Sequence, residues 1–270
     1  MITVDSLKSD PLWQSPLDRE ALYRLLSVVT GKSLSMLTAF PETGLAPEQA
    51  AAFQLLAQRY REGEPLAYIL GEQGFWSLTL SVSPDVLIPR PDTECVVEAV
   101  LSLGAGQRWR VADLGTGSGA IALSLAKEHP DWEIVATDAS SAALAVARAN
   151  AVKNRISQVD FRLGSWFEPL DGRFHLIVSN PPYIAESDPH LASLTREPLQ
   201  ALVAPDEGLA DIDWLTAHAA SYLHPLGWLV VEHGWLQDAA VQSLFRRSGF
   251  REVRTGYDYG GNPRFTLGCL

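Results

Sequence analysis

The sequence predicts an α/β fold, in which a small helical domain precedes a parallel sheet with helices on both faces. Three observations support this. The first seventy or so residues carry only helical patterns, strand and helix patterns alternate from about residue 110 onward, and two extended runs near the end flank a glycine-containing turn. Alternating strands and helices are typical of doubly wound sheets, whose ligands bind at the carboxyl ends of the strands.

The N-terminal segment, residues 1–72, is predicted to form a helical bundle. Ser15 followed by Pro16 is a helix start, apolar residues then recur at helical spacing, and Gly31 ends the helix. A second helix begins near Pro47 and is broken at Gly63. The apolar stripes are interpreted as core, and the outer face of the bundle is left open as a docking surface for a substrate.

An alternating pattern follows in residues 73–88 and predicts a β-hairpin that links the bundle to a third segment, residues 89–270. Within that segment Thr93 is expected to cap a helix through Val96 and Leu101. The predicted strands are Arg110 to Leu114, Glu133 to Thr137, Val159 to Leu163, Phe174 to Ser179 and Trp228 to Glu232, with helices at Ala120 to Lys127, Ala142 to Asn150 and Ile212 to Leu223. Glu252 to Thr255 and Arg264 to Leu267 predict a terminal antiparallel hairpin.

Composition excludes several classes of protein. The chain has 270 residues with a net charge of -11, and no tract is rich in Lys or Arg, so a direct nucleic-acid partner is not expected, although a local basic groove stays possible. Neither a leader at the N-terminus nor an apolar run of membrane-spanning length is present, which predicts a cytoplasmic location without a membrane partner. The spacing of the two cysteines and six histidines predicts no metal site.

A glycine loop joins the first predicted strand of the sheet to its helix. Gly115, Thr116, Gly117, Ser118 and Gly119 form a G-x-G-x-G pattern two residues after Asp113. Alternate glycines let a ligand lie directly on the backbone, and Asp138, at the end of the next strand, can hold ribose hydroxyls. A tight turn without a ligand remains an alternative for the loop, as does a helix cap for Asp138.

A second motif, Asn180-Pro181-Pro182-Tyr183, follows the fourth predicted strand of the sheet. The Asn180 side chain and the Pro181 carbonyl are two adjacent acceptors, and the proline rings stiffen the backbone that presents them. Two fixed acceptors suit an NH2 group, and Tyr183 offers a flat surface for a planar group. The alternative is a turn in which the prolines only end the strand.

Together these motifs resemble those of the class I S-adenosylmethionine-dependent methyltransferases, a family with a Rossmann-like fold. Three further stretches narrow the resemblance: GEPLAYILG at Gly63 to Gly71, VLIPRPDTE at Val86 to Glu94, and Arg196-Glu197-Pro198. Over essentially the whole chain the sequence is similar to the peptide chain release factor glutamine N5-methyltransferases, the PrmC/HemK family.

This resemblance implies transfer of a methyl group from S-adenosylmethionine, with S-adenosylhomocysteine as product, to the glutamine amide in the Gly-Gly-Gln loop of class 1 release factors. It implies that Gly115 to Gly119 cradle the cofactor, that Asp138 takes its ribose, that Trp166 lines the adenosine pocket, and that Asn180 to Tyr183 hold the substrate, with Asn180 also beside the cofactor. The family often has an acid where this chain has Ser165, and Asp92 replaces a glutamate.

The chemistry expected from these residues needs no strong base. Asn180 and Pro181 each accept one N–H of the amide, which orients its nitrogen and favours the positive charge that develops on attack. The proton can leave late, because the alkylated nitrogen is acidic. Glu197, Glu232 and His233 are therefore interpreted as structural or supporting residues, and Arg90 as part of a lid or wall.

Three alternatives stay open. A nucleic-acid methyltransferase acting on adenine N6 or guanine N2 can use the same tetrapeptide, but the absence of basic tracts argues against it. A non-catalytic nucleotide-binding module would account for the glycine loop but not for the tetrapeptide. An NAD-dependent oxidoreductase is disfavoured by the glycine spacing.

Overall fold

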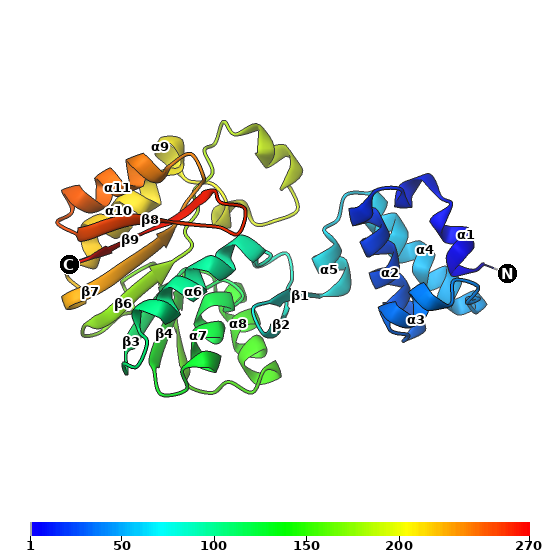
Figure 1. Cartoon of the computed structure of the whole chain (residues 1–270), viewed down its shortest axis with the longest axis horizontal. Coiled ribbons are helices and arrows are strands. Elements are labelled where there is room, and N and C mark those ends of the chain that lie inside the picture. Colours follow the sequence, from blue (N-terminus) through cyan, green and yellow to red (C-terminus); the bar gives the residue numbers. More distant parts are fainter. Residues whose placement is uncertain (1) are drawn as a thin grey trace. The chain divides into compact units, whose positions relative to one another are not determined.

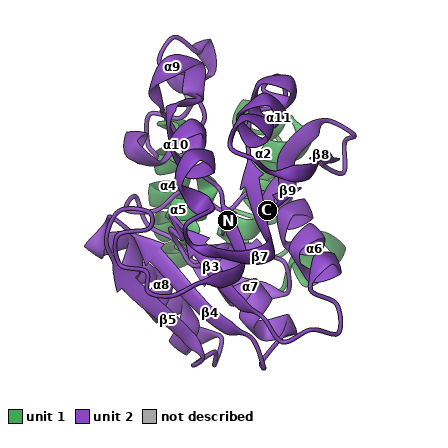
Figure 2. Ribbon diagram, turned by 90° about the vertical axis from the view of Figure 1, so that its left-hand side faces the viewer, with its two compact units in different colours: residues 1–71 green, residues 72–270 purple. Residues whose placement is uncertain are grey.

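The protein, described here by a computed structural model over residues 2–270, consists of two compact units. The units comprise residues 1–71 and 72–270 (Figure 2). The linking hairpin that follows Gly71 belongs to the second unit. None of the helices in the described residues is long and apolar enough to cross a bilayer.

The first unit is entirely helical. Its elements are α1 (Val4–Lys8), the 3-10 helix η1 (Pro11–Trp13), α2 (Pro16–Thr30), α3 (Leu34–Ala39), α4 (Pro47–Arg61) and α5 (Leu66–Leu70). The Ser15 hydroxyl accepts the Asp18 N–H at the start of α2, and Gly31 ends the helix with a φ of 70°. The two helices that the sequence predicts are therefore confirmed, and their apolar stripes form the core of this unit.

The second unit opens with a hairpin of β1 (Glu72–Phe75) and β2 (Leu78–Ser81). A 3-10 helix, η2 (Pro91–Thr93), then leads into α6 (Glu94–Leu103). The prediction that Thr93 caps this helix is wrong, because Thr93 has helical dihedrals and its side chain accepts no capping hydrogen bond. The Thr93 hydroxyl is used elsewhere, at the site described below.

A seven-stranded sheet forms the centre of the second unit (Figure 1). Its strands are β3 (Arg110–Leu114), β4 (Glu133–Asp138), β5 (Val159–Leu163), β6 (Phe174–Ser179), β7 (Leu223–Glu232), β8 (Arg251–Tyr257) and β9 (Pro263–Cys269). The order in the sheet is β5-β4-β3-β6-β7-β9-β8, with β3 to β7 parallel and the β8–β9 hairpin antiparallel at one edge. This confirms the predicted Rossmann-like sheet with a terminal hairpin.

Helices cover both faces of the sheet. They are α7 (Ala120–Glu128), α8 (Ser141–Lys153), the short α9 (Pro205–Gly208), α10 (Ala210–Ala219) and α11 (Asp238–Arg247), with 3-10 helices η3 (Pro189–Ser193) and η4 (Leu199–Ala201). Buried side chains form two apolar cores, which contain residues of α6, α7 and α8 in one case and of α10 and α11 in the other.

One predicted helix ends well before its expected end, and one helix of the structure was not predicted. The helix expected at Ile212 to Leu223 ends at Ala219, because Leu223 pairs with Phe174 and starts β7. Helix α11 was not predicted, although its apolar residues Val241, Leu244 and Phe245 recur at helical spacing and two of them, Val241 and Phe245, are buried. The end of the first of these helices is decided by strand pairing, which the local apolar period does not reveal.

The chain forms β3, β4 and β5 in one direction across the sheet and then returns to the other side of β3 to form β6. These two strands are neighbours, and the last residue of β3, Leu114, pairs with the last residue of β6, Ser179. The buried Ser179 hydroxyl donates to the Leu114 carbonyl at 2.7 Å. The glycine loop and the tetrapeptide therefore leave the sheet side by side, at the position where doubly wound folds bind ligands.

Candidate active site

A cavity of about 550 Å³ opens at the carboxyl ends of the parallel strands. Its walls come from the segment before α6, the glycine loop, the end of β4, the loop after β5, the tetrapeptide and the segment around η4. The predicted site residues that line it are Gly115, Thr116, Gly117, Ser118, Asp138, Trp166, Asn180 and Pro182. The structure thus brings the two motifs together around one space.

The glycine loop has a conformation that requires glycine. Gly115 and Gly119 have φ angles of 72° and 84°, which L side chains rarely adopt. A Cβ at Gly115 would lie 3.3 Å from the Trp166 ring, and one at Gly119 would lie 3.0 Å from Leu123. Gly119 does not line the cavity, so it serves the close packing of α7.

Asp138 ends β4 and faces the glycine loop. One carboxylate oxygen accepts the Gly117 N–H and the other accepts the Ser140 N–H, both at 2.8 Å. The cap of α8 is Ser140, whose hydroxyl accepts the Ala143 N–H. Asp138 is therefore not the cap of the helix, and each of its oxygens keeps a lone pair for another donor.

Asp113 is fully buried at the end of β3, below the same loop. Its Oδ2 accepts from the Thr116 hydroxyl at 2.6 Å and from the Ala122 N–H at 3.1 Å. Its Oδ1 has no hydrogen-bond partner among the described residues, although Asp113 contributes to the cavity wall. Burial raises the pKa of Asp113 to about 6, and the hydrogen bond from Thr116 acts against that rise.

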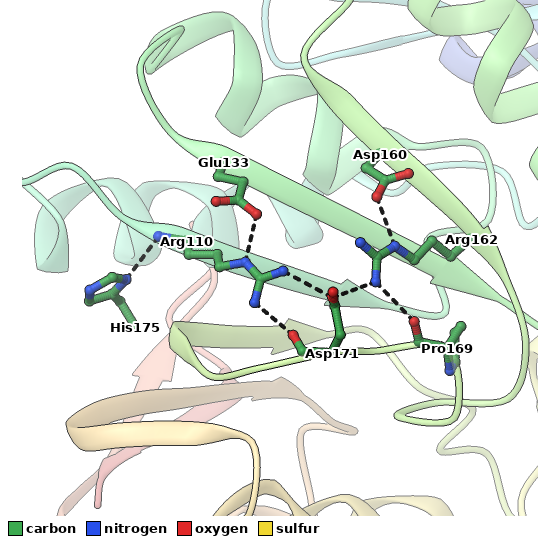
Figure 3. A network of polar contacts seen from close by, with 7 residues as sticks. All are labelled: Arg110, Glu133, Asp160, Arg162, Pro169, Asp171 and His175. Atoms are coloured by element: carbon green, nitrogen blue, oxygen red, sulfur yellow. Dashed lines mark hydrogen bonds and ion pairs between the residues drawn. The ribbon is translucent and has the colours of Figure 1, made fainter.

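Trp166 is held by the loop between β5 and β6. Its φ of 47° lies in the left-handed region, and its carbonyl accepts from the Thr137 hydroxyl at 3.0 Å. The far end of this loop is tied to the sheet by Asp171, which binds Arg110 and Arg162 (Figure 3). Arg162 also donates to the Pro169 carbonyl at 3.0 Å. These contacts fix both ends of the segment that carries Trp166.

The tetrapeptide presents its residues in different directions. Asn180 and Pro182 line the cavity, whereas Pro181 and Tyr183 are not among the lining residues. Asn180 Nδ2 donates to Thr93 Oγ1 over a long 3.4 Å, and the Tyr183 hydroxyl donates to Glu232 Oε1 at 3.2 Å. The Tyr183 ring packs against the second apolar core, so its hydroxyl anchors the loop from below.

Glu232, the last residue of β7, is the buried carboxylate beneath the tetrapeptide. Its exposed fraction is 1%. Burial raises its pKa to about 7, while the nearby Thr93 hydroxyl, the charge of Arg264 and the hydrogen bond from Tyr183 all act to lower it. Arg264 in turn pairs with Asp92 and Asp258, each at 3.1 Å. The charges around Glu232 therefore form one connected group.

A second ion pair holds the segment before η2 over the cavity. Arg90 lines the cavity and pairs with Glu197 at 2.5 Å, and the other oxygen of Glu197 accepts the Ile88 N–H. Glu197 thus joins the stretch Val86 to Glu94 to its own stretch, Arg196-Glu197-Pro198.

His233 follows β7 and is held by hydrogen bonds to the Thr266 hydroxyl and to the Gly234 carbonyl, and burial lowers its pKa.

Sequence reasoning missed part of this group. Thr93 was assigned to a helix cap, Arg264 to a strand only, and Glu232 to a supporting role without a stated partner. One signal was available, because an acid at the end of the apolar strand Leu229 to Val231 is costly unless it is paired. Among the described residues no cluster of three or more His, Cys, Asp or Glu could hold a metal ion, and the expected absence of a metal stays a prediction.

Two solved methyltransferase structures share this fold. A methyltransferase from Pyrococcus furiosus superimposes with a TM-score of 0.56 at 17% identity, covering 79% of this chain and 96% of that one. The T. thermophilus 16S rRNA N2 methyltransferase RsmC, solved with AdoMet and guanosine, gives 0.54 at 20% identity, covering 73% and 49%. The chain therefore shares the Rossmann-like fold of these methyltransferases.

Comparison of the sequence gives the family. Residues 13–71 match the model of the PrmC N-terminal domain, and residues 93–201 match the methyltransferase small domain. The chain is 53% identical to the release factor glutamine methyltransferase of Yersinia pestis, over 90% of this chain and 89% of the relative. It is 48% identical to that of Pseudomonas aeruginosa, over 97% and 96%. The chain belongs to the release factor glutamine methyltransferase family.

The buried Asp113 makes the stability of the second unit depend on pH. Its folded pKa of about 6 exceeds the ordinary 3.8, so the stability that it contributes is fully present below pH 3.8 and is lost as the pH rises through 6. Asp113→Asn cannot ionise. We expect its free energy of unfolding, relative to wild type, to rise by about 2 kcal/mol between about pH 4 and pH 8.

Urea unfolding at several pH values measures this difference. Glu98→Gln, on the exposed face of α6, controls for the loss of a carboxylate as such. A difference between Asp113→Asn and wild type that does not change with pH would contradict the assignment of a buried, destabilising charge.

Proposed function

We propose that this protein transfers the methyl group of S-adenosylmethionine to the side-chain amide nitrogen of the glutamine in the Gly-Gly-Gln motif of class 1 peptide chain release factors. The observation that carries the proposal is the pairing of Leu114 with Ser179, which sets the glycine loop beside the Asn-Pro-Pro-Tyr loop in a chain 53% identical to a release factor glutamine methyltransferase. We further infer that it acts in the cytoplasm, where release factors work.

The residues around the cavity fit S-adenosylmethionine. Asp113 Oδ1 is a buried acceptor that lacks a donor among the described residues, and it suits the ammonium group of the cofactor. Asp138 retains lone pairs for ribose hydroxyls, and the Gly115 to Gly119 backbone leaves room for the ligand. Trp166 supplies an aromatic wall for the adenosine. When bound, S-adenosylmethionine supplies an electrophilic methyl group on a sulfonium centre.

The tetrapeptide supplies the substrate contacts. An amide nitrogen is a weak nucleophile, because its lone pair is delocalised into the carbonyl. Asn180 Oδ1 and the Pro181 carbonyl would each accept one N–H of the glutamine amide, which directs the nitrogen toward the methyl group. The same two acceptors favour the positive charge that develops on the nitrogen. Pro182 and Tyr183 hold the backbone that presents them.

Proton removal needs no dedicated base. The nitrogen becomes acidic once it is alkylated, so water or a weak acceptor can take the proton after the attack. Glu232 is not among the residues that line the cavity, and its Oε1 accepts from the Tyr183 hydroxyl. We therefore assign Glu232 no role as a general base.

Transfer of label from S-adenosylmethionine tests the proposed function. We expect label in a Gly-Gly-Gln release factor and none in its Gln→Ala variant. Label in DNA or RNA, with none in the release factor, would instead favour methylation of a nucleic-acid amino group.

Removal of the substrate acceptor should separate catalysis from cofactor binding. We expect Asn180→Ala to lower kcat by about a hundredfold or more, the scale for loss of one preorganised polar contact in an active site, while calorimetry shows retained cofactor affinity. Asn154→Ala, at the end of α8 and remote from the cavity, is the matched control. Near-normal turnover of Asn180→Ala on a release factor would refute the mechanism.

Loss of the Asp138 carboxylate should weaken the cofactor. Asp138→Ala removes an acceptor for the ribose and the contact that holds the Gly117 N–H, so we expect affinity to fall by about tenfold or more, equivalent to about 1.4 kcal/mol. Calorimetry with S-adenosylmethionine measures the change, and circular dichroism checks the fold. Unchanged affinity would restrict Asp138 to holding the loop.

A further inference from the structure

We infer that Gln237 and Gly208 are positioning residues that hold the Asn180 to Tyr183 loop by its last carbonyl, and so aim its acceptors at the substrate. The inference rests on the proposed function, in which Asn180 Oδ1 and the Pro181 carbonyl each accept one N–H of the glutamine amide. Tyr183 is not among the residues that line the cavity, so the loop is held from outside the space where substrate and cofactor meet.

The Gln237 side chain makes three hydrogen bonds, all of them to backbone groups. Its Nε2 donates to the Tyr183 carbonyl and to the Glu207 carbonyl, both at 3.0 Å, and its Oε1 accepts the Gly234 N–H at 2.8 Å. A backbone carbonyl only accepts and a backbone N–H only donates, so these partners fix which end of the Gln237 amide faces which group. Gln237 thus joins the tetrapeptide to α9 and to the turn that follows β7.

Gly208 of α9 lies directly against the same carbonyl. A Cβ at this position would lie 2.0 Å from the Tyr183 carbonyl oxygen and 2.6 Å from the carbonyl carbon. Both are backbone atoms, which cannot rotate aside as the end of a side chain can. Gly208 also has a φ of 80°. Only glycine fits here, because the conformation and the close contact both exclude a side chain.

The turn that carries Gly208 has a strained backbone. Asp206 and Glu207 have φ angles of 54° and 55°, so three consecutive residues are left-handed. L side chains disfavour this conformation, and it persists only where surrounding contacts hold it. The Glu207 carbonyl is held by Gln237, and the Asp206 carbonyl accepts the Leu209 N–H at 3.0 Å. The strained turn is thereby kept against the tetrapeptide.

The tetrapeptide needs a hold at both of its ends. Before it, the Ser179 hydroxyl bonds the Leu114 carbonyl in the sheet, and the two prolines then stiffen the backbone. A stiff segment that is held only at its start can still swing as a unit about that point. The Tyr183 hydroxyl limits this motion through a longer bond of 3.2 Å to Glu232. The contacts of Gln237 with the backbone carbonyl restrain the end of the loop itself, and so the angle at which its acceptors face the substrate.

The kinetics of a conservative variant test the inference. Gln237→Met keeps the length of the side chain and loses its three hydrogen bonds. We expect its kcat for methyl transfer to a Gly-Gly-Gln release factor to fall by about tenfold or more, because displacing a positioned group is costly. Its affinity for S-adenosylmethionine, measured by calorimetry, should stay within about twofold of wild type, because neither Gln237 nor Tyr183 lines the cavity. Gln242→Met, which removes a hydrogen bond between α11 and Thr255, is the matched control and should keep kcat near wild type.

The Asn180→Ala background distinguishes positioning from a general structural effect. If Gln237 acts by aiming the acceptors of the loop, then Gln237→Met should lower kcat by less than about threefold in that background. A sheet domain that was merely loosened would show the full loss in both backgrounds, together with weaker binding of S-adenosylmethionine. Either of these results, or near-wild-type kcat for Gln237→Met with Asn180 intact, would overturn the inference.

A second variant reaches the same carbonyl from α9. Gly208→Ala places a Cβ where the Tyr183 carbonyl lies, so we expect it also to lower kcat by about tenfold or more. Gly249→Ala is the matched control, because Gly249 has a φ of 89° but a Cβ there would meet no atom within 4 Å. Equal kcat for the two alanine variants would count against the inference. Should a melting curve show that Gly208→Ala unfolds, the cycle with Gln237→Met decides.

The same measurements keep this inference distinct from the proposed function. Wild-type protein that fails to label the release factor would refute the function, and the inference with it. Label transfer by the wild type, together with near-wild-type kcat for Gln237→Met, would leave the function standing and refute only the positioning role.

Discussion

The site depends on one constraint, which is that β3 and β6 are parallel neighbours whose last residues, Leu114 and Ser179, pair in register. The buried hydroxyl of Ser179 bonds the Leu114 carbonyl and so closes the sheet at this end. Because the next residues are Gly115 on one side and Asn180 on the other, a cofactor on the first loop meets a substrate on the second. Neither loop could be displaced along its strand without losing this meeting point.

Below the two loops lie groups that a stability-optimised core would exclude. Asp113 Oδ1 and Glu232 Oε2 are buried oxygens without hydrogen-bond partners among the described residues, and burial raises the pKa of both carboxyls. Such groups reduce stability, since buried charge is costly. Their placement at strand ends under the cofactor and substrate loops explains their presence. Asp113 offers an acceptor to the cavity, and Glu232 accepts from the Tyr183 hydroxyl beneath the tetrapeptide.

Much of the fold follows from sequence patterns, and the site follows in part. The β3, β5 and β6 boundaries are those predicted: β3 and β6 are mostly buried, and β5 alternates apolar and charged residues. The start of β7 was not predictable, because it depends on pairing with the remote strand β6, whereas α11 has a helical apolar period that the prediction missed. For the site, the glycine loop and tetrapeptide have local patterns. The Glu232, Thr93 and Arg264 group is assembled from segments far apart in the chain, and no local spacing reveals it.

The most direct test of the account is a crystal structure of this protein with S-adenosylhomocysteine and a Gly-Gly-Gln peptide. The account predicts that the glutamine amide nitrogen lies about 2.7–3.2 Å from both Asn180 Oδ1 and the Pro181 carbonyl, with Asn180 Nδ2 turned to Thr93 and the nitrogen facing the sulfur. A glutamine amide bound away from Asn180, or a cofactor bound away from the Gly115 to Gly119 loop, would contradict it.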